Sequence, residues 1–251
     1  MNLDLTVKKL LNGDIDNKYD DKVFWYASKV TIVDKKVNVY VNNDNLVAFD
    51  RVNLDIKKIS EFHKVKQKDV NDMRNVLVSS GSFLFINEKL AVTQRESDTT
   101  YDPSFWTTPA GRCDRTILET GIKETMEEIE IQRNGKILLP DISYLFPHEI
   151  KNFEFYRTTP SNKNIPLKTY DVNLYLDNNL IQTCKSWMYY SKDVNTIEFR
   201  IPIFTQLNED KLIFKGEYET DTGLKTIDTL KKLDTVPALK KLIEEIKNEK
   251  N

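Results

Sequence analysis

The sequence predicts an α+β fold in which a β-rich section precedes a mixed domain of strands and helices. Three patterns support this prediction: runs of β-branched and aromatic residues, turn-forming residues between the runs, and two segments whose apolar residues recur with helical spacing. The character of the chain changes at Val76. We therefore expect an N-terminal β-rich extension over residues 1–75 and a second domain, ending in a helix, over residues 76–251.

The extension is predicted to contain a β-meander. Turn-forming residues at Asp34-Lys35 and Asn42–Asn45 separate three strand-like runs. The runs span Lys22–Val33, Lys36–Val41 and Leu46–Phe49. The charged segment Ile56–Val76, which carries scattered apolar residues, is expected to contain a helix that leads into the second domain.

The second domain begins with a predicted hairpin over Phe83–Arg95, whose turn lies at Asn87–Lys89. Apolar residues at helical spacing then predict a helix over Thr116–Ile131. The strand-like segments that follow are Asp141–Phe146, Phe153–Arg157, Tyr170–Leu176, Trp187–Tyr190, Thr196–Phe204 and Lys211–Phe214. The chain is predicted to end in an amphipathic helix, with Thr235 as its N-cap and Pro237 in its first turn.

Composition and charge exclude several classes of protein. Cys113 and Cys184 are the only cysteines and there are two histidines, so any metal must be a hard cation held by oxygen rather than zinc held by sulfur or imidazole. A net charge of −2 gives no strong signal for nucleic-acid binding. The chain has no apolar run of about 20 residues and no signal-peptide pattern, so we expect no membrane association and a cytoplasmic location.

The predicted helix Thr116–Ile131 carries a cluster of carboxylates. Glu124, Glu127 and Glu128 stand at positions i, i+3 and i+4, which places them on one face of a helix. Three carboxylates so close together repel one another, and a magnesium or manganese ion between them would offset that repulsion. Taken alone, the pattern fits a solvated helix face better, because Glu-rich faces are common. The preceding Pro109-Ala110-Gly111 is a tight turn whose backbone can approach a ligand closely.

Together these segments resemble the Nudix hydrolases. The signature of that family is Gly, five residues, Glu, seven residues, then Arg-Glu-apolar-x-Glu-Glu-x-Gly-apolar. Lys123–Ile131 is similar to its second half, and Gly111 to its leading Gly, within a Trp-x-x-Pro-Ala-Gly segment. The strand ending in Gln94-Arg95 and the late Val-Pro-Ala-Leu segment resemble the flanks of the box. The resemblance covers residues 76–247 and implies an α/β/α sandwich with a mixed sheet.

The box departs from the family pattern at four points. The interval from the leading Gly to Glu124 is two residues shorter, and Asp114 or Arg115 occupies the region of the family's first Glu. Lys123 replaces Arg, which keeps the charge but loses the planar fork. Glu130 replaces the Gly that ends the helix, where a non-Gly residue resists the left-handed conformation.

The resemblance implies a pyrophosphohydrolase that uses Mg²⁺ or Mn²⁺. Water would attack one phosphorus of a diphosphate linkage in a small nucleoside diphosphate derivative. Lys123 would orient the cluster through a salt bridge, while Arg95 and Gly111 would contact the substrate. The implied metal ligands are Glu124, Glu127, Glu128, the carbonyl of Ala110, and Glu217 or Glu219 from a late loop. Either Glu124 or a late-loop carboxylate could act as the general base.

Each of these residues also has a purely structural interpretation. Lys123 could be a solvated lysine, Arg95 a partner in a surface salt bridge, and Glu217 and Glu219 part of a charged surface turn. A second hypothesis is a Nudix-like module that binds a nucleotide or sugar diphosphate without cleaving it, which the shortened interval and Glu130 favour. N-terminal β extensions in the family often pair between subunits, so the resemblance also allows a homodimer.

Overall fold

The computed structural model describes residues 23–48, 76–97, 102–133, 136–141, 155–159, 161–192, 195–207, 212–214 and 219–248. The helix predicted within Ile56–Val76 lies outside these residues, except for Val76 itself. The candidate metal ligand Glu217 lies outside them as well. Within the described part of the chain, no helix combines the length and the apolar character that crossing a membrane requires.

The chain divides into two compact units, each assembled from three segments. Unit 1 comprises Met1–Ser80, Gly111–Thr120 and Thr169–Phe199, and unit 2 comprises Gly81–Ala110, Gly121–Lys168 and Arg200–Asn251. The division falls inside strands β3 (Val76–Ile86), β6 (Ala110–Arg112) and β12 (Thr196–Thr205) and inside helix α3 (Ile117–Glu128). These four elements therefore contribute residues to both units.

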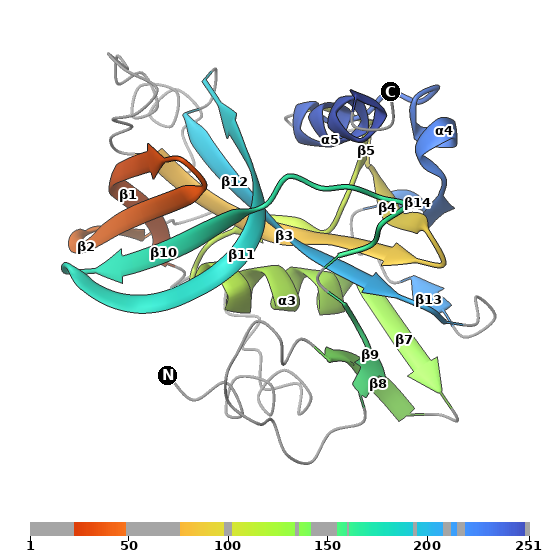
Figure 1. The fold of residues 1–251 in the computed structure, drawn as a ribbon, viewed down its shortest axis with the longest axis horizontal. Coiled ribbons are helices and arrows are strands. Elements are labelled where there is room, and N and C mark those ends of the chain that lie inside the picture. The colour runs from red at the N-terminus through yellow and green to blue at the C-terminus, as the bar shows by residue number, and fades with distance from the viewer. Residues whose placement is uncertain are drawn as a thin grey trace. The chain divides into compact units, whose positions relative to one another are not determined.

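The strands of unit 1 form a ring. They are β1 (Val23–Val33), β2 (Lys36–Ala48), β10 (Tyr170–Leu176), β11 (Asn179–Ser191) and the first parts of β3 and β12. The antiparallel hairpins β1–β2 and β10–β11 lie side by side, and β10 runs parallel to β2 with Asp171 opposite Lys36 (Figure 1). The order continues through β12 to β3, and β3 pairs with β1 where Leu77 lies opposite Tyr26. This last pairing closes the ring.

Side chains of β2 alternate between buried and partly exposed positions, as expected for a strand with one covered face. Val37, Val39 and Val41 of β2 are fully buried, whereas the residues between them are partly exposed. On the outer face, the Asn173 amide of β10 donates a hydrogen bond to Asn38 Oδ1 of β2 at 3.0 Å. The valines of β2 are thus buried, whereas the opposite face of the strand carries polar residues.

Both cysteines lie in unit 1 and are buried, Cys113 to 0% and Cys184 to 4% exposure. Burial raises the pKa of the Cys184 thiol to about 12. Because only the thiolate attacks a disulfide reagent, we predict that neither cysteine reacts with Ellman's reagent in the native protein under mildly alkaline conditions. Both should react once urea unfolds the chain. A fast-reacting equivalent in the native protein would contradict this placement.

Unit 2 contains the rest of the large sheet and a small second sheet. Its first sheet adds β4 (Lys89–Arg95), β5 (Trp106–Thr107) and β14 (Glu219–Lys225) to β3 and β12. Strand β6 (Ala110–Arg112) pairs with β3 and continues into unit 1. The second sheet has four strands, in the order β13 (Leu212–Phe214), β7 (Ile129–Arg133), β8 (Lys136–Asp141) and β9 (Phe155–Arg157). The helices are α3, α4 (Ile227–Leu230) and α5 (Pro237–Asn248).

The large sheet is mixed, as predicted. Within unit 1 the Leu77 amide donates to the Asn195 carbonyl, and within unit 2 the Asn87 amide donates to the Thr205 carbonyl. Because the two contacts have the same spacing along both strands, β3 and β12 run parallel. The pair β2–β10 is parallel too, whereas β4 pairs antiparallel with β14 and β5.

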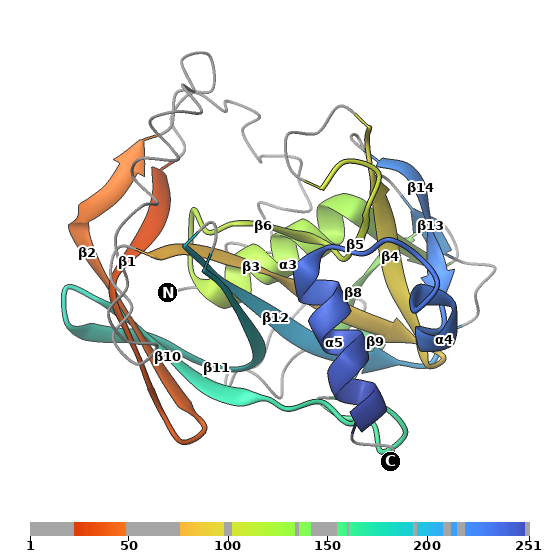
Figure 2. The ribbon, with the colours of Figure 1, turned by 90° about the horizontal axis from the view of Figure 1, so that it is seen from above.

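In unit 2, helices cover both faces of the sheet. Figures 1 and 2 show α3 and α5 on opposite sides of β3 and β4. Helix α5 begins at Pro237 and buries an apolar stripe of Ala238, Leu239, Leu242, Ile243 and Ile246. The predicted N-cap Thr235 is one residue too early, because the Val236 carbonyl accepts the first helical hydrogen bond, from the Lys240 amide. Trp106, which is 6% exposed, hydrogen-bonds through its backbone to Asp234 and Val236 just before this helix. The predicted α+β class and the layered arrangement of helices about a mixed sheet are confirmed.

Several predicted boundaries are wrong, among them the start of the strand expected at Phe83, which begins at Val76 instead. The helix expected over Thr116–Ile131 ends at Glu128, because the β-branched Ile129 and Ile131 are buried in β7 and pair with β13. The turn expected at Asn42–Asn45 is part of the continuous strand β2. The strand expected over Asp141–Phe146 lies outside the described residues except for Asp141, which is the last residue of β8.

Candidate active site

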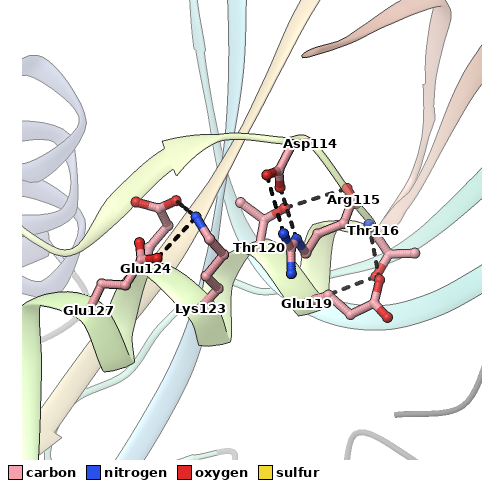
Figure 3. A network of polar contacts seen from close by, with 8 residues as sticks. All are labelled: Asp114, Arg115, Thr116, Glu119, Thr120, Lys123, Glu124 and Glu127. Atoms are coloured by element: carbon pink, nitrogen blue, oxygen red, sulfur yellow. Dashed lines mark hydrogen bonds and ion pairs between the residues drawn. The ribbon is translucent and has the colours of Figure 1, made fainter. Parts of the chain in front are cut away.

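Helix α3 begins with a capping box. The Thr116 amide donates to Glu119 Oε2 at 3.2 Å, and the Glu119 amide approaches Thr116 Oγ1 at 3.4 Å (Figure 3). The Leu118 amide donates to Gln182 Oε1 at 3.2 Å. These contacts satisfy N–H groups that a helix start leaves unpaired. They fix where the helix starts, despite the shortened interval before it.

Asp114 and Arg115, which precede α3, pair with each other. Arg115 Nε donates to Asp114 Oδ1 at 2.9 Å, and a second guanidinium nitrogen donates to Asp114 Oδ2 at 3.3 Å (Figure 3). This two-point pairing engages both oxygens of the Asp114 carboxylate. Within unit 1, an ion pair between neighbouring residues therefore stabilises the loop before α3.

Lys123 lies between two of the three glutamates. Its Nζ is 3.4 Å from Glu124 Oε1 and 3.2 Å from Glu127 Oε1 (Figure 3). The lysine side chain is only 4% exposed, against 17% for Glu124 and 40% for Glu127. A buried ammonium requires such partners, and it also reduces the repulsion between the carboxylates. The reading of Lys123 as a solvated lysine is wrong.

Glu128 is held by the neighbouring sheet. Thr93 of β4 is fully buried, and its Oγ1 donates to Glu128 Oε2 at 3.3 Å. Successive side chains of a strand point to opposite faces, so Arg95, two residues beyond Thr93, points to the same face. Arg95 Nε is buried and has no hydrogen-bond partner among the described residues. This strand end therefore offers a cationic donor on the face that carries a glutamate.

The late-loop candidate Glu219 belongs to β14. It lies opposite Arg95 in the antiparallel pairing of β14 with β4. Two residues that are far apart in the sequence, both selected as candidates, are thus adjacent across this strand pair. The register places Glu219 at the same end of β4 as Arg95.

The turn at Pro109-Ala110 lies directly against β3. The Ser82 amide donates to the Pro109 carbonyl at 3.1 Å. A Cβ on Gly81 would be 2.0 Å from that carbonyl oxygen and 2.7 Å from Ala110 Cβ. Only glycine allows this approach. In unit 1, Ser79 Oγ donates to the carbonyl of Gly111 at 2.8 Å, which fixes the next peptide of the segment.

Sequence reasoning missed Gly81, Ser82 and Thr93. A signal for Gly81 was present, because an isolated glycine inside a strand pattern marks a bulge or a close approach of another backbone. Ser82 and Thr93 are fully buried polar residues in otherwise apolar strands. Their positions hint at buried hydrogen bonds, but the partners come from segments that sequence spacing does not connect.

The donor chemistry of the three glutamates suits a hard divalent cation. Carboxylate oxygens are the preferred ligands of Mg²⁺, and each carboxylate can accept several contacts, so pairing with Lys123 does not exclude a metal. In the described residues, however, no three side chains of His, Cys, Asp or Glu come together as a group that could hold a metal ion. The donors are thus present on α3 but not gathered around a common point.

The chain is similar to solved structures, but it matches no family model and no curated protein by sequence. A NUDIX hydrolase from Nitrosomonas europaea is similar, with a TM-score of 0.37, 12% identity, and 70% of this chain and 91% of that chain covered. An Ap4A hydrolase from C. elegans has a TM-score of 0.40 and 13% identity, covering 69% of this chain and 96% of that one. The NUDIX domain of Shewanella oneidensis NrtR, complexed with ADP ribose, has a TM-score of 0.39 and 11% identity, covering 70% and 89%.

Proposed function

We propose that this protein is a pyrophosphohydrolase of the Nudix type, which cleaves a diphosphate linkage in a small nucleoside diphosphate derivative. The observation that carries the proposal is the glutamate face of α3. Glu124 and Glu127 flank the buried Lys123, and Glu128 accepts a hydrogen bond from the strand that ends in Arg95. Arg95 and the three glutamates all belong to unit 2, and they supply the hard oxygen donors and the cationic group that this reaction needs.

Each residue has a role in this proposal. Glu124, Glu127 and Glu128 would hold Mg²⁺ or Mn²⁺, with the Ala110 carbonyl as a further ligand and a late-loop carboxylate, Glu217 or Glu219, as another. When bound, the cation offsets phosphate charge and lowers the pKa of the attacking water. Lys123 keeps two of the carboxylates in position.

The substrate is bound by the remaining groups. Arg95 presents a guanidinium that can donate to phosphate oxygens. A general base removes the proton from the attacking water, and the carboxylates of Glu124 and the late loop are the two candidates for that step.

A substrate panel tests the proposed activity. The purified protein is incubated with ADP-ribose, dinucleoside tetraphosphates, nucleotide sugars and nucleoside triphosphates, with Mg²⁺, with Mn²⁺ and with EDTA, and the products are separated by chromatography. We expect at least one diphosphate to be cleaved between its phosphates only when a divalent cation is present. The proposal fails if no compound is cleaved, or if EDTA leaves the rate unchanged.

The alternative is a module that binds such a diphosphate without cleaving it. The specific observation in its favour is that Lys123 already pairs with both Glu124 and Glu127 and offsets one of their two negative charges, while no metal-binding group of three is assembled among the described residues. Calorimetry with ADP-ribose separates the two functions. A binding module retains its affinity in EDTA and shows no turnover, whereas the hydrolase binds more tightly with the cation and forms products.

Thr93→Val tests the support that β4 gives to Glu128. The substitution preserves shape but removes the hydroxyl that donates to Glu128 Oε2. Groups that orient a metal ligand typically change metal affinity or activity by about 10–100-fold, so we expect the Mg²⁺ concentration for half-maximal hydrolysis to rise by about that factor. The matched control is Thr183→Val, which removes an exposed strand hydroxyl that donates to Asn173. Equal metal dependence in both variants would refute this role for Thr93.

A further inference from the structure

A pair of buried hydroxyl groups links α3 to β3 in unit 2. Thr125 Oγ1 of α3 lies 2.6 Å from Ser82 Oγ of β3 and 2.6 Å from the Gly121 carbonyl oxygen. Ser82 is 0% exposed and Thr125 2% exposed. The carbonyl of Gly121 can only accept, so the Thr125 proton goes to it, and the Ser82 hydroxyl supplies the proton between the two side chains.

The same serine also binds the turn. Its amide donates to the Pro109 carbonyl at 3.1 Å, so Ser82 touches the turn through its backbone and α3 through its side chain. Thr125 follows Glu124 directly and precedes Glu127 by two residues. One residue of β3 therefore connects the turn that contains Ala110 with the stretch of α3 that carries the glutamates.

The polarity of this contact is unexpected for a packing position. Thr125 lies on the same side of α3 as the buried Leu118 and Ile122, seven and three residues before it. An aliphatic side chain there would pack against β3 without a preferred direction, whereas a buried hydroxyl costs desolvation unless its partner is correctly placed. Linked hydrogen bonds also reinforce one another in a low-dielectric interior. A hydroxyl pair thus penalises small shifts of the helix along the strand.

We infer that Ser82 and Thr125 are positioning residues, which set the glutamates of α3 relative to the Pro109-Ala110 turn. This inference rests on the proposed function, because the glutamates and the Ala110 carbonyl are the groups proposed to hold the cation. Neither hydroxyl touches the substrate. Their effect is exerted through the distance between the helix and the turn.

Four variants separate positioning from mere stability: Ser82→Ala, Thr125→Val, Thr125→Ser and the double variant Ser82→Ala/Thr125→Val. Thr125→Val leaves the Ser82 hydroxyl buried without its partner, so its urea midpoint should fall most. The double variant removes both polar groups, so its midpoint should recover toward wild type. Thr125→Ser keeps the hydroxyl and should behave like wild type in every assay.

Activity should not follow stability in this series. We expect kcat to fall by about tenfold, and the Mg²⁺ concentration for half-maximal rate to rise by about tenfold, in both Thr125→Val and the double variant. The KM for the substrate should change less than twofold. A double variant that regains wild-type kcat together with its stability would show a merely structural contact and overturn the inference.

A second measurement keeps the inference testable if the wild type cleaves no substrate. In that case the proposed hydrolase activity is refuted. Binding at the site is then measured by the shift in melting temperature that Mn²⁺ and ADP-ribose together cause. A wild-type shift that is lost in the double variant but kept in Thr125→Ser supports positioning. An equal shift in all variants, or no shift in the wild type, overturns it.

Discussion

Replacing Glu127 by glutamine is expected to lower hydrolysis by a factor on the order of 10²–10⁴, since the substitution removes a negative charge at the cation while preserving shape. The fold should be retained. Glu127 is 40% exposed, and Lys123, its partner at 3.2 Å, keeps its second contact with Glu124. The measurement is kcat/KM at saturating Mg²⁺, with the melting temperature recorded for the same preparation.

The matched control for this variant is Glu245→Gln. Glu245 pairs with Lys241 at 3.7 Å in the same i, i+4 arrangement, but on α5, which carries none of the proposed site residues. We expect wild-type turnover from the control and a melting temperature within a few degrees of wild type for both variants. Wild-type turnover in Glu127→Gln would remove Glu127 from the proposed site.

The largest effect on stability is expected from Gly81→Ala. The added methyl group would lie 2.0 Å from the Pro109 oxygen and 2.7 Å from Ala110 Cβ. Relief requires the turn to move, which would break the hydrogen bond from the Ser82 amide to Pro109. Overpacking typically costs about 1–3 kcal/mol, and a clash with backbone falls at or above the upper end of that range. Urea unfolding monitored by fluorescence measures the change in unfolding free energy.

Gly223→Ala is the control for the glycine substitution. Gly223 lies in β14, and a Cβ there would meet nothing within 4 Å. Replacing glycine by alanine at such a position is expected to raise the unfolding free energy by about 0.4–1 kcal/mol, because the unfolded chain loses conformational freedom. If Gly81→Ala were as stable as Gly223→Ala, the close approach of the turn to β3 would be refuted.

Local patterns in the sequence predicted the parts of the site that lie on one element. The spacing of Glu124, Glu127 and Glu128 follows from helical geometry alone, and the helix that carries them is confirmed. The capping box of Thr116 and Glu119 also has a readable local pattern, although it was not predicted. The end of the helix was wrong because β-branched residues after Glu128 gain more from pairing with β13 than from another helical turn.

Contacts between distant segments could not be predicted from one sequence. The parallel pairing of β2 with β10 joins the N-terminal extension to residues from the predicted second domain. The contact of Ser82 with Thr125 and that of Thr93 with Glu128 likewise connect strands with α3. Spacing within a segment carries no information about which distant segment will cover it. The resemblance implied a salt bridge from Lys123 to a glutamate, whereas its burial and its contact with two carboxylates come from the structure.

Hydrolysis in water enriched in ¹⁸O tests the central claim most directly. The wild-type protein is incubated with Mg²⁺ and its best diphosphate substrate, and the phosphate-containing products are weighed by mass spectrometry. We predict that a single ¹⁸O atom enters one phosphate product, because water attacks phosphorus, and that this product is absent in EDTA and scarce with Glu127→Gln. Cleavage without ¹⁸O in a phosphate, or equal labelling in EDTA, would contradict a cation-dependent attack of water at phosphorus by this site.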